Sequence, residues 1–372
     1  MIDHITPGSG TRRSWAQRLH LDAMLLLGLV AACMLGLIIL YSSAGQSGNL
    51  VIGQAVRLAI SFGALFLVAQ IPPQFLFRWS PWLFGIGIAL LGAVLAFGDV
   101  GKGAQRWLDV GFVRFQPSEM VKLSVPMMIA WYLSDTKLPP SMRHLFTALM
   151  LIVVPTLLIA RQPDLGTALL IGSSGFFVLF LAGLQWRILI ILSLAAAGCA
   201  PLLWYFMHDY QRQRVITFLN PEQDPLGTGY HIIQSKIAIG SGGLYGKGWL
   251  NGTQAHLEFL PERSTDFIFA VLGEEFGLMG ILMLLAIYSL ILLRCIYIAT
   301  QAQDTFTRLL GGSLALTFFV YVIVNTGMVT GLLPVVGLPL PLISFGGTSM
   351  VTLMAGFGIL MSIHTHRKLL PA

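Results

Sequence analysis

Long apolar runs separated by short polar stretches fill most of this chain. Each run is roughly 16 to 22 residues long, and a helix of about 20 residues crosses a hydrocarbon core of about 30 Å. The pattern therefore predicts membrane-spanning helices. We expect ten of them, at residues 22–41, 51–70, 81–97, 117–134, 145–160, 165–183, 186–207, 278–299, 308–329 and 347–364.

Two of these runs leave alternatives. The fifth is short and contains Pro155, so a tilted, paired or incompletely spanning segment, and hence nine spans, is the alternative count. The first follows Arg12, Arg13 and Arg18 and precedes Ser42-Ser43-Ala44, which resembles a signal peptide with its cleavage site. Its apolar run is longer than that of an ordinary signal peptide, and further spans follow, so we predict an uncleaved first helix.

Composition narrows the class of protein. The 372 residues are 56% hydrophobic and only 10% charged, and the mean hydropathy is +0.79, which is typical of an all-α polytopic membrane protein. The three cysteines all lie in apolar runs and imply neither a disulfide nor a metal site. The basic residues are spread over many loops, so we expect no nucleic acid partner.

The distribution of charge predicts the orientation. Ten spans place both termini on one side of the membrane. The termini and short loops on that side carry basic residues, of which Arg12 is the first and Lys368 the last. The positive-inside rule makes that side cytoplasmic. The opposite, periplasmic loops are also basic, either because long loops escape the rule and acidic neighbours balance them, or because an anionic ligand binds there. Their cations are Lys102, Arg106, Arg114, Arg161, Arg212, Arg214, Lys236, Lys247 and Arg263.

The largest predicted periplasmic loop, between the seventh and eighth spans, covers residues 208–265. It contains Asn220-Pro221 and a glycine series from Gly240 to Gly248, and long loops of this kind commonly carry recognition or chemistry. The glycines do not predict a nucleotide site, because Lys247 is followed by Gly248 rather than by Ser or Thr.

The apolar run 267–299 is too long for one span, since it would measure about 50 Å as a single helix. It contains Glu274, Glu275 and Gly277, and we predict that it breaks or bends. A separate helical segment, 266–277, is expected on or partly within the outer membrane surface. Asp266 would lie at its N-terminus, where free backbone N–H groups favour a carboxylate. Because Glu274 and Glu275 are adjacent, at most one of them can face the same site, and the other is expected to be solvated or paired.

Three charged residues fall in the outer half of predicted spans. Arg57 lies roughly 10 Å from the outer end of the second span, and Glu119 and Lys122 share one face of the fourth. A lipid-facing charge costs about 2.5 to 3.5 kcal/mol, so these residues need a partner or a watery cavity. They either form an ion pair that clamps helices or line an outward-open cleft for a lipid head group. Asp164, which starts the sixth span, either caps that helix or joins the cleft, and capping is the first choice.

Five motifs occur in order along the chain. They are Gln116-Pro117-Ser118-Glu119 with Lys122, Arg161-Gln162-Pro163-Asp164-Leu165-Gly166-Thr167, Gly240-Ser241-Gly242-Gly243-Leu244-Tyr245-Gly246-Lys247-Gly248, Phe259-Leu260-Pro261-Glu262 with Thr265-Asp266-Phe267-Ile268-Phe269, and Pro339-Leu340-Pro341-Leu342-Ile343-Ser344-Phe345-Gly346-Gly347. With these motifs the chain resembles the SEDS family of bacterial cell-wall polymerases over essentially its whole length. The elongation type is favoured by Gly248-Trp249-Leu250 and by Val336, where division-type members usually carry lysine.

The resemblance implies a function. It implies a single domain over 1–372 in the bacterial cytoplasmic membrane, and a peptidoglycan glycosyltransferase that polymerises lipid II, an undecaprenyl diphosphate carrying a disaccharide and a peptide stem. It also implies a class B penicillin-binding protein as partner, within the elongation machinery that maintains rod shape. Two alternatives remain: a transporter that flips the same lipid, and a non-catalytic scaffold for a transpeptidase.

Polymerisation requires a base for the attacking sugar hydroxyl and cations for the departing diphosphate. Asp266, which matches the family's catalytic position, is the candidate base. Glu262 is a second carboxylate that could open a route through a covalent intermediate. The cation candidates are Arg57, Lys122, Arg212, Arg214, Lys247 and Arg263, and a divalent cation, Mg²⁺ or Mn²⁺, is an open alternative with no assigned ligands. Arg106, beside Trp107, could contact sugar or phosphate, and Glu119, Asp164 and Glu262 complete the substrate-binding set.

Overall fold

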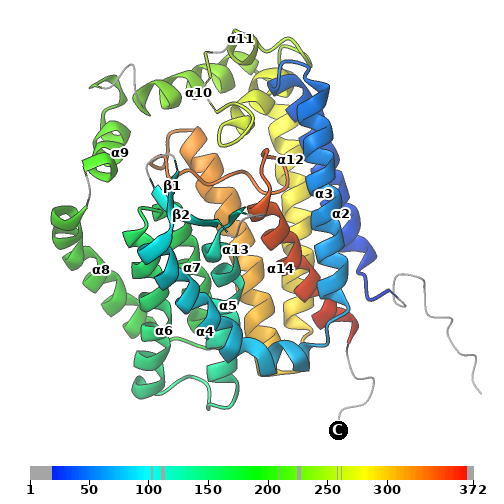
Figure 1. The fold of residues 1–372 in the computed structure, drawn as a ribbon. Helices are drawn as coiled ribbons and strands as arrows, with labels where there is room; N and C mark the ends of the chain where they lie inside the picture. The colour runs from blue at the N-terminus through cyan, green and yellow to red at the C-terminus, as the bar shows by residue number, and fades with distance from the viewer. Residues whose placement is uncertain are drawn as a thin grey trace, which may run out of the picture.

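The structure is a computed structural model that describes residues 19–101, 104–109, 114–207, 209–223, 228–257, 259–260 and 262–366. Long helices form an upright bundle, and shorter helices lie across one end of it (Figure 1). We call that end, which α10 (Thr228–Gly242) and α11 (Thr253–His256) cover, the capped end. The opposite end, where residues 19 and 366 lie, is called the terminal end.

Every predicted apolar run lies within a helix except for one or two residues at its ends, because runs of Leu, Ile, Val, Ala and Phe combine helix-forming residues with apolar surface on all sides. The N-terminal half of the bundle consists of α2 (Ala23–Ser43), α3 (Gly48–Ala69), α4 (Pro73–Phe97), α5 (Pro117–Ser134) and α6 (Met142–Arg161). The C-terminal half consists of α7 (Leu165–Leu181), α8 (Trp186–Phe206), α12 (Ile268–Thr300), α13 (Thr305–Val329) and α14 (Thr348–Thr365).

Seven helices in the described part of the chain are long and apolar enough to cross a membrane, namely α2, α3, α4, α6, α12, α13 and α14. The remaining three candidates are weaker by this measure: α7 has 17 residues, α5 carries Glu119 and Lys122, and α8 is described only in part. A multi-pass helical membrane fold is therefore confirmed, whereas the count of ten spans stays a prediction.

The segment 208–265, expected as a loop, is largely helical where it is described. It contains α9 (Asp209–Leu219), a 3₁₀ turn η1 (Pro221–Gln223), α10 and α11. The face of α10 that carries Ile232, Ser235 and Ala238 is buried, and residues three apart share one side of a helix. Glycines and prolines along the segment hid this short periodic pattern.

A small antiparallel sheet, which the all-α prediction missed, connects α4 to α5. The strands β1 (Asp99–Gly101), β2 (Ala104–Asp109) and β3 (Arg114–Phe115) pair in the order β1-β2-β3. Asp99 pairs with Trp107, and Leu108 pairs with Phe115. Such short strands carry too few residues for an alternating pattern to be recognised.

The helix α12 bends at Gly277, whose backbone angles of φ 62° and ψ −158° are not helical. The break that the long apolar run predicted is therefore present. The N-terminal part of α12, from Ile268 to Glu275, is buried within the protein rather than lying on a surface, which corrects the predicted surface helix. It packs against α10, so its carboxylates need partners inside the molecule.

The connection between α13 and α14 folds back into the bundle. Its residues Leu338, Leu340, Leu342 and Ile343 are buried, and Tyr288 of α12 donates a hydrogen bond to the carbonyl oxygen of Pro341. A side chain on Gly36 of α2 would collide with this segment, because an added Cβ would lie 2.9 Å from the Cα of Ile343. We call residues 337–345 the platform.

The two ends of the described chain meet at the terminal end of the bundle. The imidazole of His20 stacks on that of His366, with ring centroids 4.0 Å apart. Beside them, Asp22 accepts hydrogen bonds from Arg294 at 3.0 Å and 2.6 Å, and the Nε2 atom of His364 lies 3.4 Å from the same carboxylate. These contacts fasten α2, α12 and α14 together. The basic residues Arg12, Arg13, Arg18, Arg367 and Lys368 lie outside the described residues.

Candidate functional site

Asp266 lies in the turn 262–267 at the capped end, immediately before α12, and its side chain is partly exposed. The N-cap of α12 is Phe267, so the predicted capping role falls one residue beyond Asp266. Backbone groups of this turn are bonded to the platform: the hydroxyl of Ser344 donates to the carbonyl of Thr265 at 2.6 Å, and the N–H of Phe345 donates to the carbonyl of Ser264 at 2.9 Å. The base candidate is therefore held on a rigid support.

The platform also passes beside the Asp266 carboxylate itself. Gly337 has a φ of +74°, a conformation that residues with a side chain rarely adopt. A Cβ added at Gly337 would lie 3.6 Å from Oδ2 of Asp266. The glycine therefore allows the backbone to turn next to the carboxylate without covering it.

Glu262 and His231 lie near the same turn. One carboxylate oxygen of Glu262 accepts a hydrogen bond from the hydroxyl of Thr265 at 2.7 Å. The imidazole of His231, on α10, stacks against Phe267 with ring centroids 5.6 Å apart. Burial lowers the pKa of His231, while the negative charge of Glu262 opposes that shift in part. Sequence reasoning missed His231, because no motif or periodic pattern marks it.

Arg57 of α3 is connected to the turn by way of the platform residue Phe345. Its guanidinium lies 4.2 Å from the centroid of the Phe345 ring, and a Cβ on Gly347 would lie 3.8 Å from its Cδ and Nε atoms. Gly347 is the N-cap of α14, whose first backbone N–H groups favour anions. Within the described residues, Arg57 forms no ion pair with a carboxylate. It is therefore not the partner of Glu119, one of the pairings that the sequence allowed.

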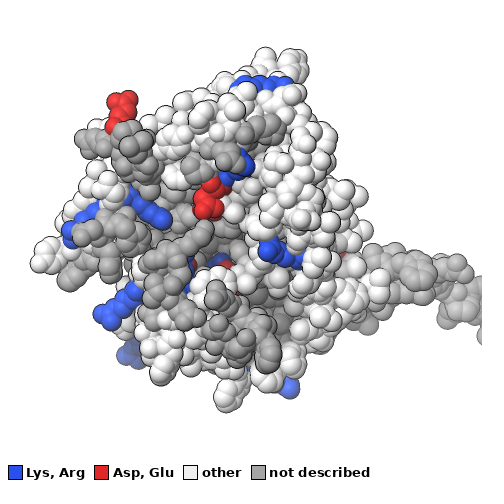
Figure 2. Space-filling model, turned by 45° about the horizontal axis from the view of Figure 1, so that its top comes forward, with Lys and Arg blue, Asp and Glu red and all other residues white. Residues whose placement is uncertain are grey.

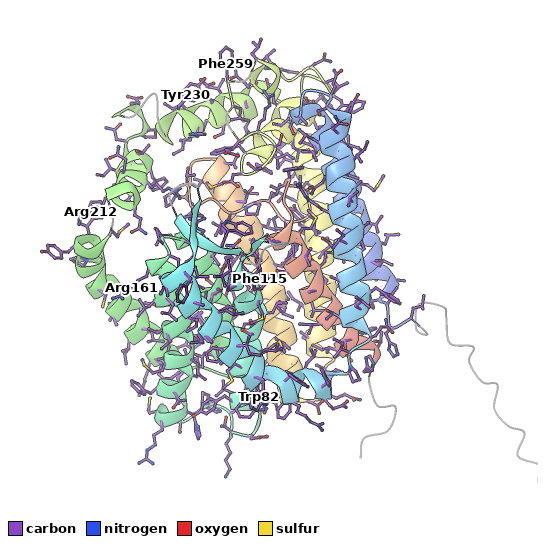
Figure 3. All side chains as sticks on the ribbon, in the orientation of Figure 1. Trp82, Phe115, Arg161, Arg212, Tyr230 and Phe259 are labelled. Atoms are coloured by element: carbon purple, nitrogen blue, oxygen red, sulfur yellow. The ribbon has the colours of Figure 1, made fainter. Side chains whose placement is uncertain are left out.

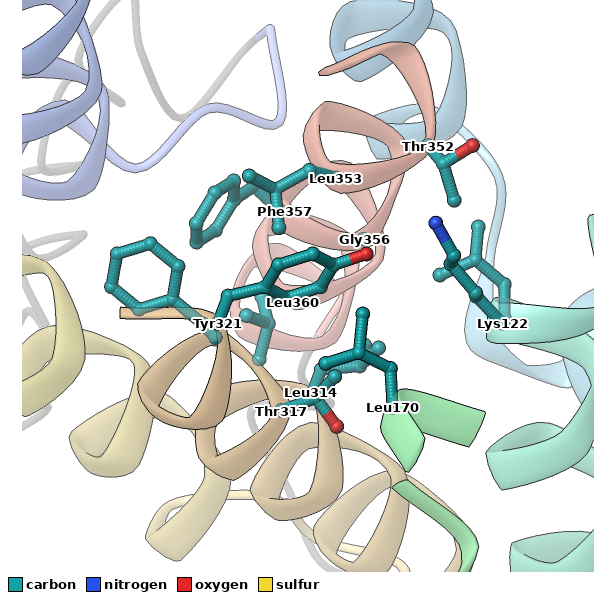
Figure 4. A pocket seen from close by; sticks show the side chains of 12 residues that line it. Lys122, Leu170, Leu314, Thr317, Tyr321, Thr352, Leu353, Gly356, Phe357 and Leu360 are labelled. Atoms are coloured by element: carbon teal, nitrogen blue, oxygen red, sulfur yellow. The ribbon is translucent and has the colours of Figure 1, made fainter. Parts of the chain in front are cut away.

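Glu119 and Lys122 form a buried ion pair on α5, with 2.8 Å between Oε1 and Nζ. This confirms the ion-pair alternative for these two residues. Lys122 also lies 5.8 Å from the ring centroid of Tyr321 on α13, beside a pocket of about 40 Å³ that leucine and phenylalanine side chains mostly line (Figure 4). A space of that size holds a few water molecules and excludes a sugar head group.

Arg106 and Asp164 join the small sheet to α7. The guanidinium Nε of Arg106 lies 3.4 Å from Oδ2 of Asp164, and another of its nitrogens donates to the carbonyl of Pro163 at 2.9 Å. Asp164 is the N-cap of α7 and accepts a hydrogen bond from the N–H of Thr167 at 3.2 Å. Its predicted capping role is therefore confirmed.

Lys247, which is partly exposed, forms a second ion pair with the buried Glu274, where the glycine-rich segment crosses α12. The Lys247 amine lies 2.7 Å from Oε1 of Glu274 and 2.8 Å from the hydroxyl of Thr253. Glu275, next along α12, accepts a hydrogen bond from Ser42 of α2. Both glutamates are buried, and Glu274 is paired with Lys247, which is one of the two outcomes expected for the glutamate that does not face the Asp266 site.

Two of the three remaining arginine candidates, Arg212 and Arg214, bond to backbone carbonyls. Arg212 donates to Trp204 and Tyr205 at 3.0 Å and 2.7 Å, at the end of α8, and lies at the edge of the molecule (Figure 3). Arg214 donates to Val335 at 3.0 Å, just before the platform. Arg263 belongs to the turn of Asp266 and is partly buried. Arg214 and Arg263 are thus associated with the Asp266 region, whereas Arg212 serves the junction of α8 with α9.

Viewed with the capped end turned forward, the molecule has a hollow with basic and acidic side chains at its rim and inside it (Figure 2). The residues that share the turn, the platform or their direct contacts are Asp266, Glu262, Arg263, Arg57 and Arg214. Among the described residues, no group of three or more His, Cys, Asp or Glu side chains is arranged to hold a metal ion. The arrangement thus offers carboxylates beside cations at a partly exposed turn.

Comparison with known proteins decides the family. The family model for FtsW, RodA and SpoVE, described as a cell cycle protein, matches residues 15–369. The chain belongs to the SEDS family. This SEDS protein is 56% identical over 360 residues to the peptidoglycan glycosyltransferase MrdB of Escherichia coli K12, covering 96% of this chain and 97% of that relative.

Solved structures resemble the SEDS protein along nearly its whole length. One is a chain from a peptidoglycan synthase complex studied for the coordination of polymerization and crosslinking; it has a TM-score of 0.82 and 34% identity, over 94% of this chain and 98% of that chain. Another is the rod shape determining protein RodA of Thermus thermophilus, with a TM-score of 0.71 and 29% identity, over 93% and 98%. The fold and the predicted resemblance are therefore confirmed together.

Proposed function

We propose that this SEDS protein is a peptidoglycan glycosyltransferase that polymerises lipid II into glycan strands for cell elongation. The observation that carries the proposal is the match, over 96% of the chain, to a relative named peptidoglycan glycosyltransferase. Two features support a site at the capped end: a partly exposed carboxylate on a fixed turn, and a cation without a carboxylate partner among the described residues, Arg57.

Asp266 is the proposed general base. The hydroxyl of the acceptor sugar attacks the anomeric carbon of the donor, the bond from that carbon to the diphosphate oxygen breaks, and the hydroxyl proton passes to the Asp266 carboxylate. The hydrogen bonds to Thr265 and Ser264 support this role, because they keep the turn in place while bonds are exchanged at the exposed carboxylate.

The six cation candidates for the diphosphate are no longer equivalent. Lys122 and Lys247 are engaged by buried glutamates, and Arg212 lies at the junction of α8 with α9. Arg57 has an aromatic ring beneath it and the N-terminus of α14 beside it, which are features that suit a phosphate oxygen. We therefore place Arg57 first for the diphosphate, with Arg263 and Arg214 as further contributors.

A divalent cation, Mg²⁺ or Mn²⁺, bound together with the diphosphate stays part of the proposal. Mg²⁺ commonly uses one or two carboxylates and substrate phosphates rather than an all-protein cage, and Glu262, in the same turn as Asp266, would supply such a carboxylate. The cation would neutralise charge on the leaving diphosphate. Activity that a chelator leaves unchanged would exclude it.

A single carboxylate acting as base implies inversion at the anomeric carbon in one displacement. Glu262 is the residue that could support a two-step route, because it belongs to the same turn as Asp266. A glycosylated carboxylate recovered by peptide mapping of the enzyme trapped with substrate would rule out the single displacement.

We further propose that the partner is a class B penicillin-binding protein and that the enzyme resides in the bacterial cytoplasmic membrane with the capped end in the periplasm. A structural relative belongs to a complex that couples polymerization with crosslinking, which supports such a partner. The basic loops predicted at the terminal end support a cytoplasmic position for both termini.

The test is glycan synthesis from lipid II by the purified protein with its transpeptidase partner. Asp266→Asn removes the base without changing the size of the side chain, and we expect at least a 100-fold loss of glycan synthesis, in line with the larger contributions of general bases. Asp135→Asn, at the end of α5 near the terminal end, is the control and should retain wild-type activity. Wild-type protein that makes no glycan while a known polymerase does so under the same conditions would refute the function.

The alternatives give different results in the same variant. A lipid flippase would not synthesise glycan from lipid II supplied in detergent, with or without Asp266. A scaffold would tolerate Asp266→Asn in cells, so normal rod shape with this variant as the sole copy would favour the scaffold.

A further inference from the structure

Asn325 is a fully buried amide in the C-terminal part of α13, and the mechanism above assigns it no role. It lies on α13, in a run of otherwise mainly apolar residues, at the level of the platform. Polar groups buried this deeply are retained where their hydrogen bonds are needed.

The amide of Asn325 makes two hydrogen bonds with the same nitrogen. Its Nδ2 atom donates to the carbonyl oxygen of Asp266 at 3.0 Å and to the carbonyl oxygen of Leu338 at 2.7 Å. Both partners are acceptors, so only the NH₂ side of the amide can face them. A leucine or an aspartate of similar size at this position could make neither bond.

These two carbonyls belong to the two backbone segments on either side of the catalytic carboxylate. One is the carbonyl of Asp266 itself. The other follows Gly337, whose added Cβ would lie 3.6 Å from Oδ2 of Asp266. Asn325 therefore fixes the separation between the Asp266 peptide and the stretch of platform that borders its side chain.

We infer that Asn325 is a positioning residue for the general base: through its two hydrogen bonds it sets where the Asp266 carboxylate stands against the platform and the substrate that binds there. The inference rests on the proposed function, since it concerns the same reaction. It predicts that loss of Asn325 slows the chemical step more than it weakens lipid II binding.

The other end of the amide argues against a role in packing alone. Within the described part of the chain, Oδ1 of Asn325 is buried and accepts no hydrogen bond. A buried acceptor without a donor opposes folding, so an apolar side chain would serve packing better. The donor bonds to Asp266 and Leu338 are the benefit that the amide provides.

Asn325→Ala is the principal test, with Ser313→Ala as its matched control. Ser313 is also fully buried on α13, and its hydroxyl donates to the carbonyl of Ser174 at 2.7 Å, so the control removes a comparable bond from the same helix. For Asn325→Ala we expect kcat for glycan synthesis to fall about 10- to 100-fold, with KM for lipid II within about twofold of wild type. Ser313→Ala should keep kcat within about twofold, although both variants lower the unfolding temperature.

Asn325→Gln, which retains the NH₂ donor on a side chain one methylene longer, guards against a failure of the alanine variant to fold and should give an intermediate kcat. A kcat for Asn325→Ala equal to that of Ser313→Ala, or a loss confined to KM, would overturn the inference. It would also be overturned if neither Asn325 variant folded while Ser313→Ala did, since Asn325 would then be a requirement of the fold. In each of these cases active wild-type enzyme and inactive Asp266→Asn would leave the proposed function intact.

Discussion

At the scale of single residues, the candidate cations differ in whether a carboxylate of the same chain already pairs with them. Lys122, Lys247 and Arg106 each face a carboxylate of the same chain, and such a lysine or arginine would have to leave its partner to bind phosphate. Arg57 instead rests on the face of Phe345, which leaves the fork of its guanidinium available for an anion. The choice among them follows from their partners rather than from their depth in the membrane.

Arg57→Gln is therefore expected to lower kcat/KM for lipid II about 10- to 100-fold, because it removes a charge-assisted hydrogen bond worth about 1.5 to 3 kcal/mol. Arg78→Gln is the control, since Arg78 is an exposed arginine on α4, near its start. Both variants are measured for glycan synthesis and for their unfolding temperature. Equal kcat/KM for the two variants would remove Arg57 from the substrate site.

Site residues could be predicted from the sequence more readily than the contacts between them. Asp266 was found from its motif, and the Glu119–Lys122 pair from a spacing of three on one helix. The Arg57–Phe345 contact and the Lys247–Glu274 pair join residues far apart in the chain, and spacing carries no information about such contacts. Asn325 gives only a weak signal in the sequence, as the single amide within the apolar run 308–329.

At the scale of elements, the glycine-rich segment and α12 approach one another backbone to backbone. The N–H groups of Lys247 and Gly248 donate to the carbonyls of Glu274 and Glu275, both at 3.0 Å, just before the bend at Gly277. A Cβ on Gly246 would lie 2.1 Å from the carbonyl oxygen of Glu275, which leaves no room for any side chain. This contact fixes the direction in which the N-terminal part of α12, and with it the Asp266 turn, leaves the membrane span.

Gly246→Ala should destabilise the protein by more than about 3 kcal/mol, because the added methyl group meets backbone that cannot move aside. Gly243→Ala is matched to it: Gly243 also has a positive φ, of 57°, but an added Cβ would meet nothing within 4 Å. That control should lose only the roughly 1 to 2 kcal/mol of a left-handed conformation. The two variants, purified from membranes in equal yield, are compared by thermal unfolding in detergent. Equal stability of Gly246→Ala and Gly243→Ala would contradict the prediction.

Secondary-structure elements could be predicted where a long apolar run marked them in the sequence. Each apolar run produced a helix, and the excess length of 267–299 correctly required a break. The missed elements, β1 to β3 and α9 to α11, are short, and tertiary contacts rather than local pattern hold them. Burial of the N-terminal part of α12 could not be foreseen either, since it depends on α10 covering it.

At the scale of the whole molecule, the terminal end is fastened by Asp22, which links the first helix to α12 and α14. Burial raises the pKa of Asp22, but hydrogen bonds from Arg294 and from the N–H of Leu25, together with the charges of Arg294 and His364, outweigh it, and the net pKa is lowered. A carboxyl whose pKa is lower in the folded than in the unfolded state stabilises the fold above its unfolded pKa of about 3.9. That stability is lost as the pH falls through the folded-state pKa.

Asp22→Asn should therefore lower the free energy of unfolding by about 1 to 3 kcal/mol at pH 7, and the difference from wild type should shrink below about pH 4. The amide keeps an oxygen for the N–H of Leu25, so the variant isolates the loss of charge. Asp304→Asn, at the N-cap of α13, is the control and should change stability little at either pH. A difference between Asp22→Asn and wild type that did not depend on pH would contradict the assigned ion pair.

The packing of α3 along α14 also has a consequence in time. Arg57 enters the membrane early in synthesis, whereas Phe345, on which it rests, follows roughly 15 to 60 seconds later at a rate of about 5 to 20 residues per second. The hydrogen-bond partners of Ser43 and Gln54, which are Ser264 and Ser344, are likewise synthesised much later. A nascent chain released before residue 337 therefore lacks both the platform and α14, and a prematurely terminated product of this kind would be inert rather than partly active. A messenger RNA that has lost its 3′ end would then yield no protein fragment able to polymerise lipid II.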